Sequence, residues 1–316
     1  MHFRTQIPIP KNTQPIDYNS KIISLGSCFA VNMSEILDYF KFQNSCNPFG
    51  ILFHPPAIER LIAFAVSQKV FTEADIFFYN ERWHCYDAHS DLSNPDPIAL
   101  INDLNTIIQS TWKQLSEATD IIITYGTAWV YRNNENSAIV ANCHKVPQKQ
   151  FEKQLLSIEV IQKSIQNTIH LIQSINPEVK IIVTVSPVRH IKDGFVENQL
   201  SKSHLISAIH GAFSLQVSAF NYFPSYEIMM DELRDYRFYA DDMLHPSQLA
   251  IDYIWKRFKE TNISETALSI MEEVETIQKS LSHKPFNPDS ESHQKFEAKL
   301  KDKIATLVSQ YSFMKF

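Results

Sequence analysis

Two continuous apolar runs constrain the fold of this chain most strongly. They are "DIIITY" at residues 120–125 and "VKIIVTVSPV" at residues 179–188. Neither run alternates apolar with polar residues, which is typical of parallel strands that helices cover on both faces. A third β-type run, residues 21–25, ends at Gly26. The sequence therefore predicts a mainly parallel sheet in a chain of 316 residues, long enough for one large α/β domain with an appendage.

Helical periodicity separates these strands. Residues 30–42, 97–118 and 155–172 carry apolar side chains at intervals of three and four positions. This alternation predicts a three-layer α/β/α fold with right-handed crossovers. The remaining expected elements are a helix at 54–68, hairpins at 76–86 and 129–143, a helix at 201–217, a last strand within 220–233 and a helix at 247–258. The prolines at positions 8 and 10 indicate an extended N-terminal arm.

The last part of the chain has a different pattern. Its apolar residues step by four and three, as in a heptad seam, and a second apolar series follows a polar linker. We therefore divide the chain into an α/β domain at 1–260 and a C-terminal helical hairpin at 261–316. The hairpin is expected to lie on the main domain or on a partner subunit, where it would form a homo-oligomer. The two series are Ile263, Ala267, Ile270, Val274, Ile277 and Leu281, then Phe296, Leu300, Ile304 and Leu307.

Composition excludes several classes of function. The net charge is −6 and no block of Lys and Arg occurs, so we expect no nucleic-acid partner. No apolar run approaches the roughly 18 residues of a membrane span, and the first residues lack the apolar core of a signal peptide, so a cytoplasmic protein is expected. Widely spaced cysteines indicate free thiols in a reducing compartment, and we expect no metal or other cofactor. The cysteines are Cys28, Cys46, Cys85 and Cys143.

Glycine is scarce, with only five in the chain. A chain so poor in glycine keeps each one where a side chain is not tolerated. Gly26 and Gly126 each end an apolar β-type run, and Gly50 lies in the turn "NPFG". These positions indicate loops at the carboxyl edge of the sheet, where open α/β folds place their sites.

Two candidate nucleophiles follow the first of these glycines. In "LGSCFA", Ser27 and Cys28 lie between a strand and a helix. Cys28 is expected near the helix N-terminus, where free N–H groups and the helix dipole stabilise a thiolate. Ser27 could be the nucleophile or could cap the helix. The alternative for Cys28 is a buried structural thiol.

A candidate base occurs late in the chain, in "YADDMLHPSQ". Asp242 precedes His245 by three residues, so its carboxylate can bind one imidazole nitrogen and leave the other free as a base. The alternative is that Asp242 caps the helix near Ser247 and that His245 has a structural role. A metal site of Asp241, Asp242 and His245 has no second cluster to complete it, so none is expected.

These segments resemble the GSCFA family. The resemblance rests on "LGSCFA", "NPFG", "ITYGTAWVY", "TVSPVRH" and "YFPSYEIMMDELRDYRFYADDMLHP", and it covers about residues 20–260. That family is grouped with the SGNH (GDSL-like) hydrolases by analogy. The resemblance therefore implies an SGNH-hydrolase-like fold, with a reaction implied less directly.

The resemblance assigns roles to individual residues. Laid without a gap on Gly26-Ser27-Cys28, the Gly-Asp-Ser block of SGNH enzymes puts its nucleophile at Cys28. Asp242 and His245 match the last block as orienting acid and general base. Gly50 is the candidate for the second-block glycine, whose N–H would help to form an oxyanion hole.

The third block departs from the SGNH pattern. Gly126 matches the glycine of Gly-x-Asn-Asp, but Thr127, Ala128 and Trp129 follow it, so the asparagine is missing. Either Thr127 or Asn47 replaces this donor, or the site does not carry out ordinary ester hydrolysis. Arg189 and His190 follow another strand at the same edge. They either bind an anionic or sugar substrate or belong to a solvated loop.

Two functions are compatible with these features. The first is an SGNH-like hydrolase or acyltransferase that acts on an ester or thioester, including a carbohydrate-linked acyl group, through a Cys28–His245–Asp242 triad. The second is a catalytically inactive SGNH-fold protein that binds a glycan or a protein partner. The missing asparagine and the C-terminal heptads favour the second.

Overall fold

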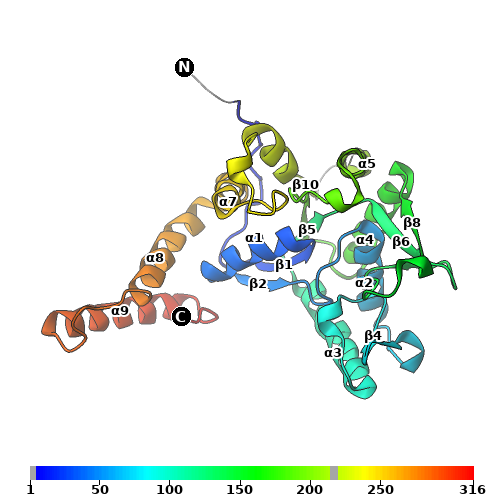
Figure 1. Ribbon diagram of the computed structural model, residues 1–316. Helices are drawn as coiled ribbons and strands as arrows, with labels where there is room; N and C mark the ends of the chain where they lie inside the picture. Colours follow the sequence, from blue (N-terminus) through cyan, green and yellow to red (C-terminus); the bar gives the residue numbers. More distant parts are fainter. Residues whose placement is uncertain (1–4, 214–219) are drawn as a thin grey trace.

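The computed structural model describes residues 5–213 and 220–316, and its centre is a parallel sheet (Figure 1). The sheet has five strands in the order β10–β9–β5–β1–β2, and every neighbouring pair is parallel. This confirms the predicted α/β fold. The order is that of a doubly wound fold whose direction of winding reverses between β1 and β5, where such folds place their ligands. The strands are β1 (Lys21–Gly26), β2 (Gln43–Cys46), β5 (Asp120–Tyr125), β9 (Lys180–Val185) and β10 (Phe220–Phe223).

Helices cover both faces of this sheet, as the apolar strands require. Side chains alternate along a strand, so Ile121 and Ile123 pack with α2–α5 on one face, while Ile122 packs with α1 and α7 on the other. The three-layer prediction is therefore confirmed. The helices are α1 (Cys28–Tyr39), α2 (Pro55–Ser67), α3 (Pro97–Glu117), α4 (Ile158–Ile175), α5 (Phe195–Phe213), the short α6 (Ser225–Glu227) and α7 (Gln248–Asn262), with a π-helical turn, η5, at Ile228–Glu232.

Two small antiparallel sheets lie outside the main one. The first is the predicted hairpin of β3 (Phe77–Tyr79) and β4 (Arg82–His84). The second contains β6 (Trp129–Asn133) between β7 (Ile139–Val140) and β8 (Phe151–Leu155). The hairpin expected at 129–143 is confirmed, but the apolar pattern does not indicate β8, and the helix expected from Leu155 begins later. That helix begins at Ile158, because Ser157 caps it by accepting a hydrogen bond from Val160 N–H at 3.4 Å.

Two further boundaries differ from the sequence-based expectation. The edge strand β2 was not predicted because its sequence, "QNSC", is polar. Its side chains are held by hydrogen bonds and not by apolar packing. Ser45 Oγ, for example, donates to Gln114 Oε1 at 3.1 Å. The helix expected at 201–217 begins earlier, at Phe195, and its expected last residues 214–217 lie outside the described residues.

The C-terminal heptads form the helices α8 (Glu265–Leu281) and α9 (Glu291–Gln310), which extend away from the sheet and return toward it (Figure 1). Gln278 Nε2 donates to the carbonyl of Tyr39 at 3.0 Å, and the Tyr311 ring lies 5.4 Å from that of Tyr18. The hairpin therefore packs on the main domain. In the described part of the chain, no helix combines the length and the apolar character that a membrane crossing requires.

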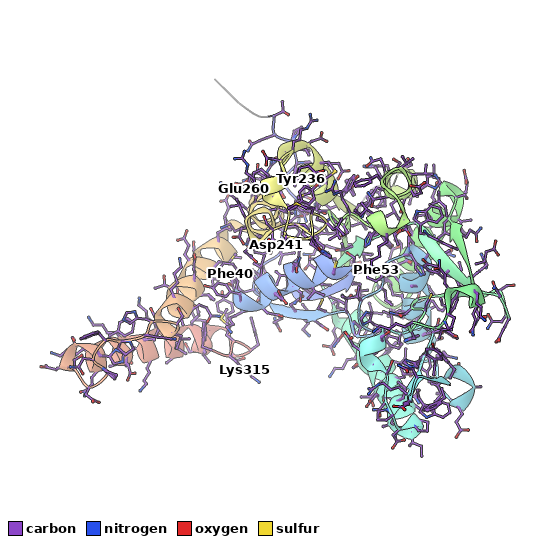
Figure 2. The ribbon with its side chains drawn as sticks, viewed as in Figure 1. Phe40, Phe53, Tyr236, Asp241, Glu260 and Lys315 are labelled. Carbon is purple, nitrogen blue, oxygen red and sulfur yellow. The ribbon has the colours of Figure 1, made fainter. Side chains whose placement is uncertain are left out.

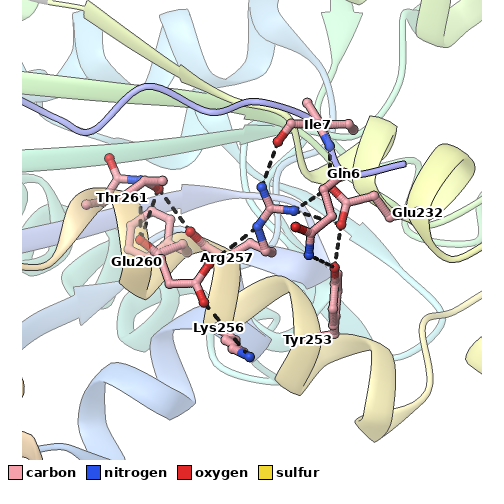
Figure 3. Close-up of polar contacts among 10 residues, drawn as sticks. Gln6, Ile7, Glu232, Tyr253, Lys256, Arg257, Glu260 and Thr261 are labelled. Atoms are coloured by element: carbon pink, nitrogen blue, oxygen red, sulfur yellow. Dashed lines mark hydrogen bonds and ion pairs between the residues drawn. The ribbon is translucent and has the colours of Figure 1, made fainter. Parts of the chain in front are cut away.

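The N-terminal arm is held along α7 by a buried ion pair (Figure 3). Arg257 Nη1 donates to both carboxylate oxygens of Glu232, at 2.5 and 2.7 Å, and these side chains are only 9% and 0% exposed. Arg257 Nη2 also donates to the carbonyl of Ile7, and Ile7 N–H donates to Glu232 Oε1. The arm thus completes a charge network that joins α7 to η5.

Candidate functional site

Two glycines bring the ends of β1 and β5 together. Gly26 has φ +126°, and a Cβ there would lie 2.0 Å from the carbonyl oxygen of Thr124, so only glycine fits. Gly126 follows β5, and a Cβ there would lie 3.2 Å from both Ser27 Cβ and the carbonyl oxygen of Phe53. These two glycines therefore lie at the carboxyl edge of the sheet, as the sequence predicted, and the strand order places them at its switch point.

Ser27 occupies the N-cap position of α1 but does not cap it with its side chain. The residue is fully buried, and its hydroxyl has no hydrogen-bond partner within residues 5–213 and 220–316. Its N–H donates to the carbonyl of Thr124 at 3.0 Å. The side-chain cap considered from the sequence is therefore wrong, and Ser27 instead packs against Gly126.

Cys28 is the first residue of α1 and is half-buried. Burial raises the pKa of its thiol above the ordinary value, while the charge of Lys202 and the N–H groups of Phe29 and Cys28 lower it. The helix N-terminus acts in the expected direction, but desolvation is the larger effect. The raised pKa disfavours the thiolate, so Cys28 needs a base before it can act as a nucleophile.

Asp242 and His245 form the predicted pair. His245 Nδ1 donates to Asp242 Oδ2 at 2.6 Å, and Asp242 Oδ1 accepts from the N–H groups of Leu244 and His245 at 2.9 and 3.0 Å. The hydrogen bonds from the backbone and ring of His245 lower the pKa of the carboxyl to about 2. Ser247 itself caps α7, so Asp242 is free to orient the imidazole and leave Nε2 available.

Arg189 fastens this turn to the carboxyl end of β9. Its N–H donates to the carbonyl of Leu244 at 3.2 Å, and Nη2 donates to that of Met243 at 2.6 Å. The guanidinium also lies over the rings of Tyr239 and Tyr236, 4.4 and 5.5 Å from their centroids. In Figure 2, Asp241, which precedes the turn, is seen between Tyr236 and α1. Arg189 therefore positions the Asp–His turn at the sheet edge that carries the start of α1.

His190 follows Arg189 and remains neutral. Burial, together with the smaller effects of the charges of Lys202 and His245, lowers the pKa of His190 to about 3. The ring lies edge-on to Phe53 at 5.7 Å, and its Nε2 is buried with no partner in the part of the chain that the structure describes. His190 borders a cavity of about 280 Å³, whose other lining residues include Phe53, Thr127, Trp129, Tyr131 and Asp193.

The residues considered for an oxyanion hole separate into two groups. Asn47 Oδ1 accepts from Gly26 N–H at 2.7 Å, and its Nδ2 is buried with no partner among the described residues. By contrast, Gly50 N–H donates to the carbonyl of Asn47 at 2.7 Å, and the Thr127 hydroxyl is hydrogen bonded to Ser201 Oγ at 3.1 Å and accepts from Trp129 N–H at 3.0 Å. Asn47 therefore offers a free donor, whereas Gly50 N–H is committed within its turn.

Sequence reasoning missed Lys202, whose side chain contacts the backbone directly after β5 and β9. Its side chain is fully buried, and Nζ donates to the carbonyls of Gly126 and Ser186 at 2.7 and 2.8 Å. Burial lowers the pKa of Lys202 to about 7, and the charge of Cys28 acts in the opposite direction. Its spacing in the sequence could have indicated that it is buried. Lys202 lies four residues after Asn198 and three before Leu205, on the buried face of α5.

The candidate residues meet at one sheet edge but are not joined into a continuous triad. Among the described residues, no hydrogen bond links Cys28 to His245, and the side-chain charge acting on Cys28 is that of Lys202. No group of three or more His, Cys, Asp or Glu residues in the described ranges could hold a metal ion.

Comparison with known families covers nearly the whole chain. The model described as the GSCFA family matches residues 21–258. A second model, described as GSCFA domain protein, C-terminal domain, matches residues 274–316, which include most of α8 and all of α9. No curated protein matches the chain.

Proposed function

Because this chain belongs to the GSCFA family and holds a thiol and an Asp–His pair at one sheet edge, we propose that it is an SGNH-like hydrolase or acyltransferase. Cys28 is the nucleophile, and the substrate is an ester or thioester. The observation that carries the proposal is the 2.6 Å hydrogen bond from His245 Nδ1 to Asp242, since it leaves Nε2 as a free base.

The reaction proceeds through an acyl-enzyme. His245 Nε2 takes the Cys28 proton, and the thiolate attacks the carbonyl carbon. The leaving alcohol or thiol then departs with the proton from His245, and the acyl group remains on Cys28. Water or a second alcohol repeats these steps in reverse and releases an acid or a new ester. In the substrate-free site the two residues are not hydrogen bonded, so the turn closes on the substrate or one water bridges them.

The oxyanion is stabilised by the Cys28 N–H and by Asn47 Nδ2. The Cys28 N–H has no carbonyl acceptor within the helix, because it lies in the first turn of α1. Asn47 supplies the amide donor that is missing after Gly126, and the 2.7 Å bond from Gly26 N–H to its Oδ1 fixes its orientation. A donor of this kind contributes about 3 kcal/mol to transition-state stabilisation.

The neighbouring cavity favours a compact substrate group. Its aromatic lining of Phe53, Trp129 and Tyr131 suits the apolar face of a sugar ring, and Asp193 and His190 add polar groups. A carbohydrate-linked acyl group is therefore the substrate class that we propose for this cavity.

A second function is favoured by the state of Cys28. Because its pKa is raised and no described residue joins it to His245, a catalytically inactive protein that binds a glycan in the same cavity is the alternative. Turnover by the purified protein separates the two functions.

The test is a panel of activated esters and thioesters, assayed on the parent protein and on Cys28→Ala and His245→Ala. Cys46→Ala is the matched control, because Cys46 is also a half-buried free thiol. We expect turnover by the parent and the control, and loss of turnover in the other two variants. No turnover by any protein would support the binding function, and full activity of Cys28→Ala would exclude Cys28 as nucleophile.

A further inference from the structure

A groove runs along the C-terminal hairpin between α8 and α9. Its outer part, of about 780 Å³, lies at the tip of the hairpin, and its lining includes Lys279 and Phe296. Its inner part, of about 560 Å³, lies nearer the main domain, and its lining includes Glu273 and Asp302. Thr276 lines both parts, so the groove is continuous. The tip extends away from the main domain (Figure 1), and the outer part of the groove therefore lies on a projecting surface.

The hairpin leaves much of its apolar surface uncovered near this groove. Within α9, a helix of 20 residues, Leu307 is the only side chain that is fully buried. Phe286, in the loop between the helices, is fully exposed, and Leu281 and Phe296 are also exposed. Two helices cannot enclose a heptad seam, whereas four helices can bury such residues in a common core. The exposed apolar side chains and the groove therefore indicate a surface that a second pair of helices covers.

The two ends of the groove carry different charges. The described residues that line the inner part include three carboxylates, among them that of Glu273, and a single lysine. Those that line the outer part include Lys279 and two histidines, and no carboxylate. Lys279 pairs with Glu275 on the same helix at 2.6 Å, but this pair is exposed, so Lys279 can exchange that contact at little cost. The groove is therefore acidic at its inner end and basic at its tip.

This arrangement of charge is complementary to itself. Glu273 precedes Thr276 by three residues along α8, and Lys279 follows Thr276 by three. In an antiparallel pairing of two hairpins about a two-fold axis near Thr276, Glu273 of each copy therefore lies opposite Lys279 of the other. A second copy of this chain thus fits the groove in both shape and charge.

We propose that the groove is the contact surface of a homodimer, in which the α8–α9 hairpins of two copies pack antiparallel across a two-fold axis near Thr276. Each contact occurs twice in such an interface, because the same surface of both copies takes part. Glu273 and Lys279 set the direction of the two hairpins, and Phe286 of each copy packs in the groove of the other. The four helices form a bundle at this end of the molecule. The dimer does not depend on the proposed acyl transfer.

The test is sedimentation velocity of the full-length protein over a range of concentrations. Glu273→Lys and Lys279→Glu each make an attractive pair repulsive, and the two-fold axis applies each change twice. Asp103→Lys, at an exposed position of α3, is the control for the change in charge. Phe286→Ser removes the exposed ring from the tip, and Phe78→Ser, at an exposed position of β3, is its control. Circular dichroism checks that each variant is folded.

We expect the parent and both controls to dimerise, and the dissociation constant of each of the three hairpin variants to rise at least about tenfold. An equimolar mixture of Glu273→Lys and Lys279→Glu, with a fluorescent label on one of them, should regain the affinity of the parent, because the exchanged charges attract again. A parent that is monomeric at every concentration would overturn the proposal. A dimer that none of the hairpin variants weakens would also overturn it, and weakened dimers that the mixture does not restore would reject the two-fold pairing.

Discussion

His245 donates from Nδ1 to the Asp242 carboxylate at 2.6 Å, while both side chains remain about half exposed. Two further hydrogen bonds, from the N–H groups of Leu244 and His245, fix the same carboxylate. Arg189 fastens the turn to the end of β9. An imidazole on the surface is thus held in one orientation, which a purely structural turn does not need.

Replacing Asp242 by Asn should lower kcat on the best activated ester by on the order of a hundredfold or more, because the base loses its orientation and charge partner. The thermal midpoint of each variant is measured in parallel, so that loss of kcat is separated from loss of folded protein. The neighbouring Asp241→Asn, also exposed, is the matched control and should retain the parent kcat. Equal activity of the two variants would contradict the assigned role.

The Asp242 carboxyl should titrate at about pH 2, below its ordinary value of 3.8, because its ionised form accepts three hydrogen bonds. A pKa lowered by folding contributes stability above the unfolded value, which is lost as pH falls from about 4 through about 2. NMR titration of the side-chain carboxyl carbon measures this midpoint. In His245→Ala the midpoint should rise, and an unchanged midpoint would show that the imidazole does not hold the carboxylate.

Asn47→Asp should reduce kcat by about 100- to 1,000-fold, as loss of one oxyanion donor does elsewhere. The substitution keeps the oxygen that accepts from Gly26 N–H, and aspartate tolerates the positive φ of 44° at this position. Asn94→Asp is the control, since Asn94 is also an acceptor for a backbone N–H but lies in a different loop. If both variants keep the parent kcat with ester substrates, Asn47 is not an oxyanion donor.

Arg257→Met should lower the free energy of unfolding by about 3–5 kcal/mol, because it leaves the buried Glu232 carboxylate unpaired. Arg234→Met is the matched control. Its pair with Asp231 is exposed, with side-chain exposures of 73% and 52%, and should be worth less than about 1 kcal/mol. Urea unfolding of both variants gives the comparison, and equal losses would mean that the N-terminal arm network does not stabilise the fold.

The parts of the fold that pack by apolar burial could be predicted from the sequence. The strands β5 and β9 have continuous apolar runs, and the apolar periodicity of α8 identified it as a helix. The strand β2 could not be predicted in this way, because its polar side chains are held by hydrogen bonds to residues distant in the sequence, such as Gln114. Its place in the sheet depends on backbone pairing with β1.

Those parts of the candidate site whose interacting residues are close together in the sequence could be predicted. Asp242 and His245 are three residues apart, so their spacing already allowed the observed hydrogen bond. Lys202 was not identified, because its role depends on carbonyl oxygens that follow β5 and β9, which are distant in sequence from α5. The net rise in the pKa of Cys28 was also missed, because desolvation depends on packing that a sequence motif does not specify.

The most direct test of the account is to identify the atom that carries the acyl group. The protein is mixed with an activated thioester, quenched in acid during the first turnover and digested for peptide mass spectrometry. The account predicts an acyl mass on Cys28, and no adduct at this position in Cys28→Ala. Acylation of Ser27, or turnover with no acyl adduct on either residue, would contradict it.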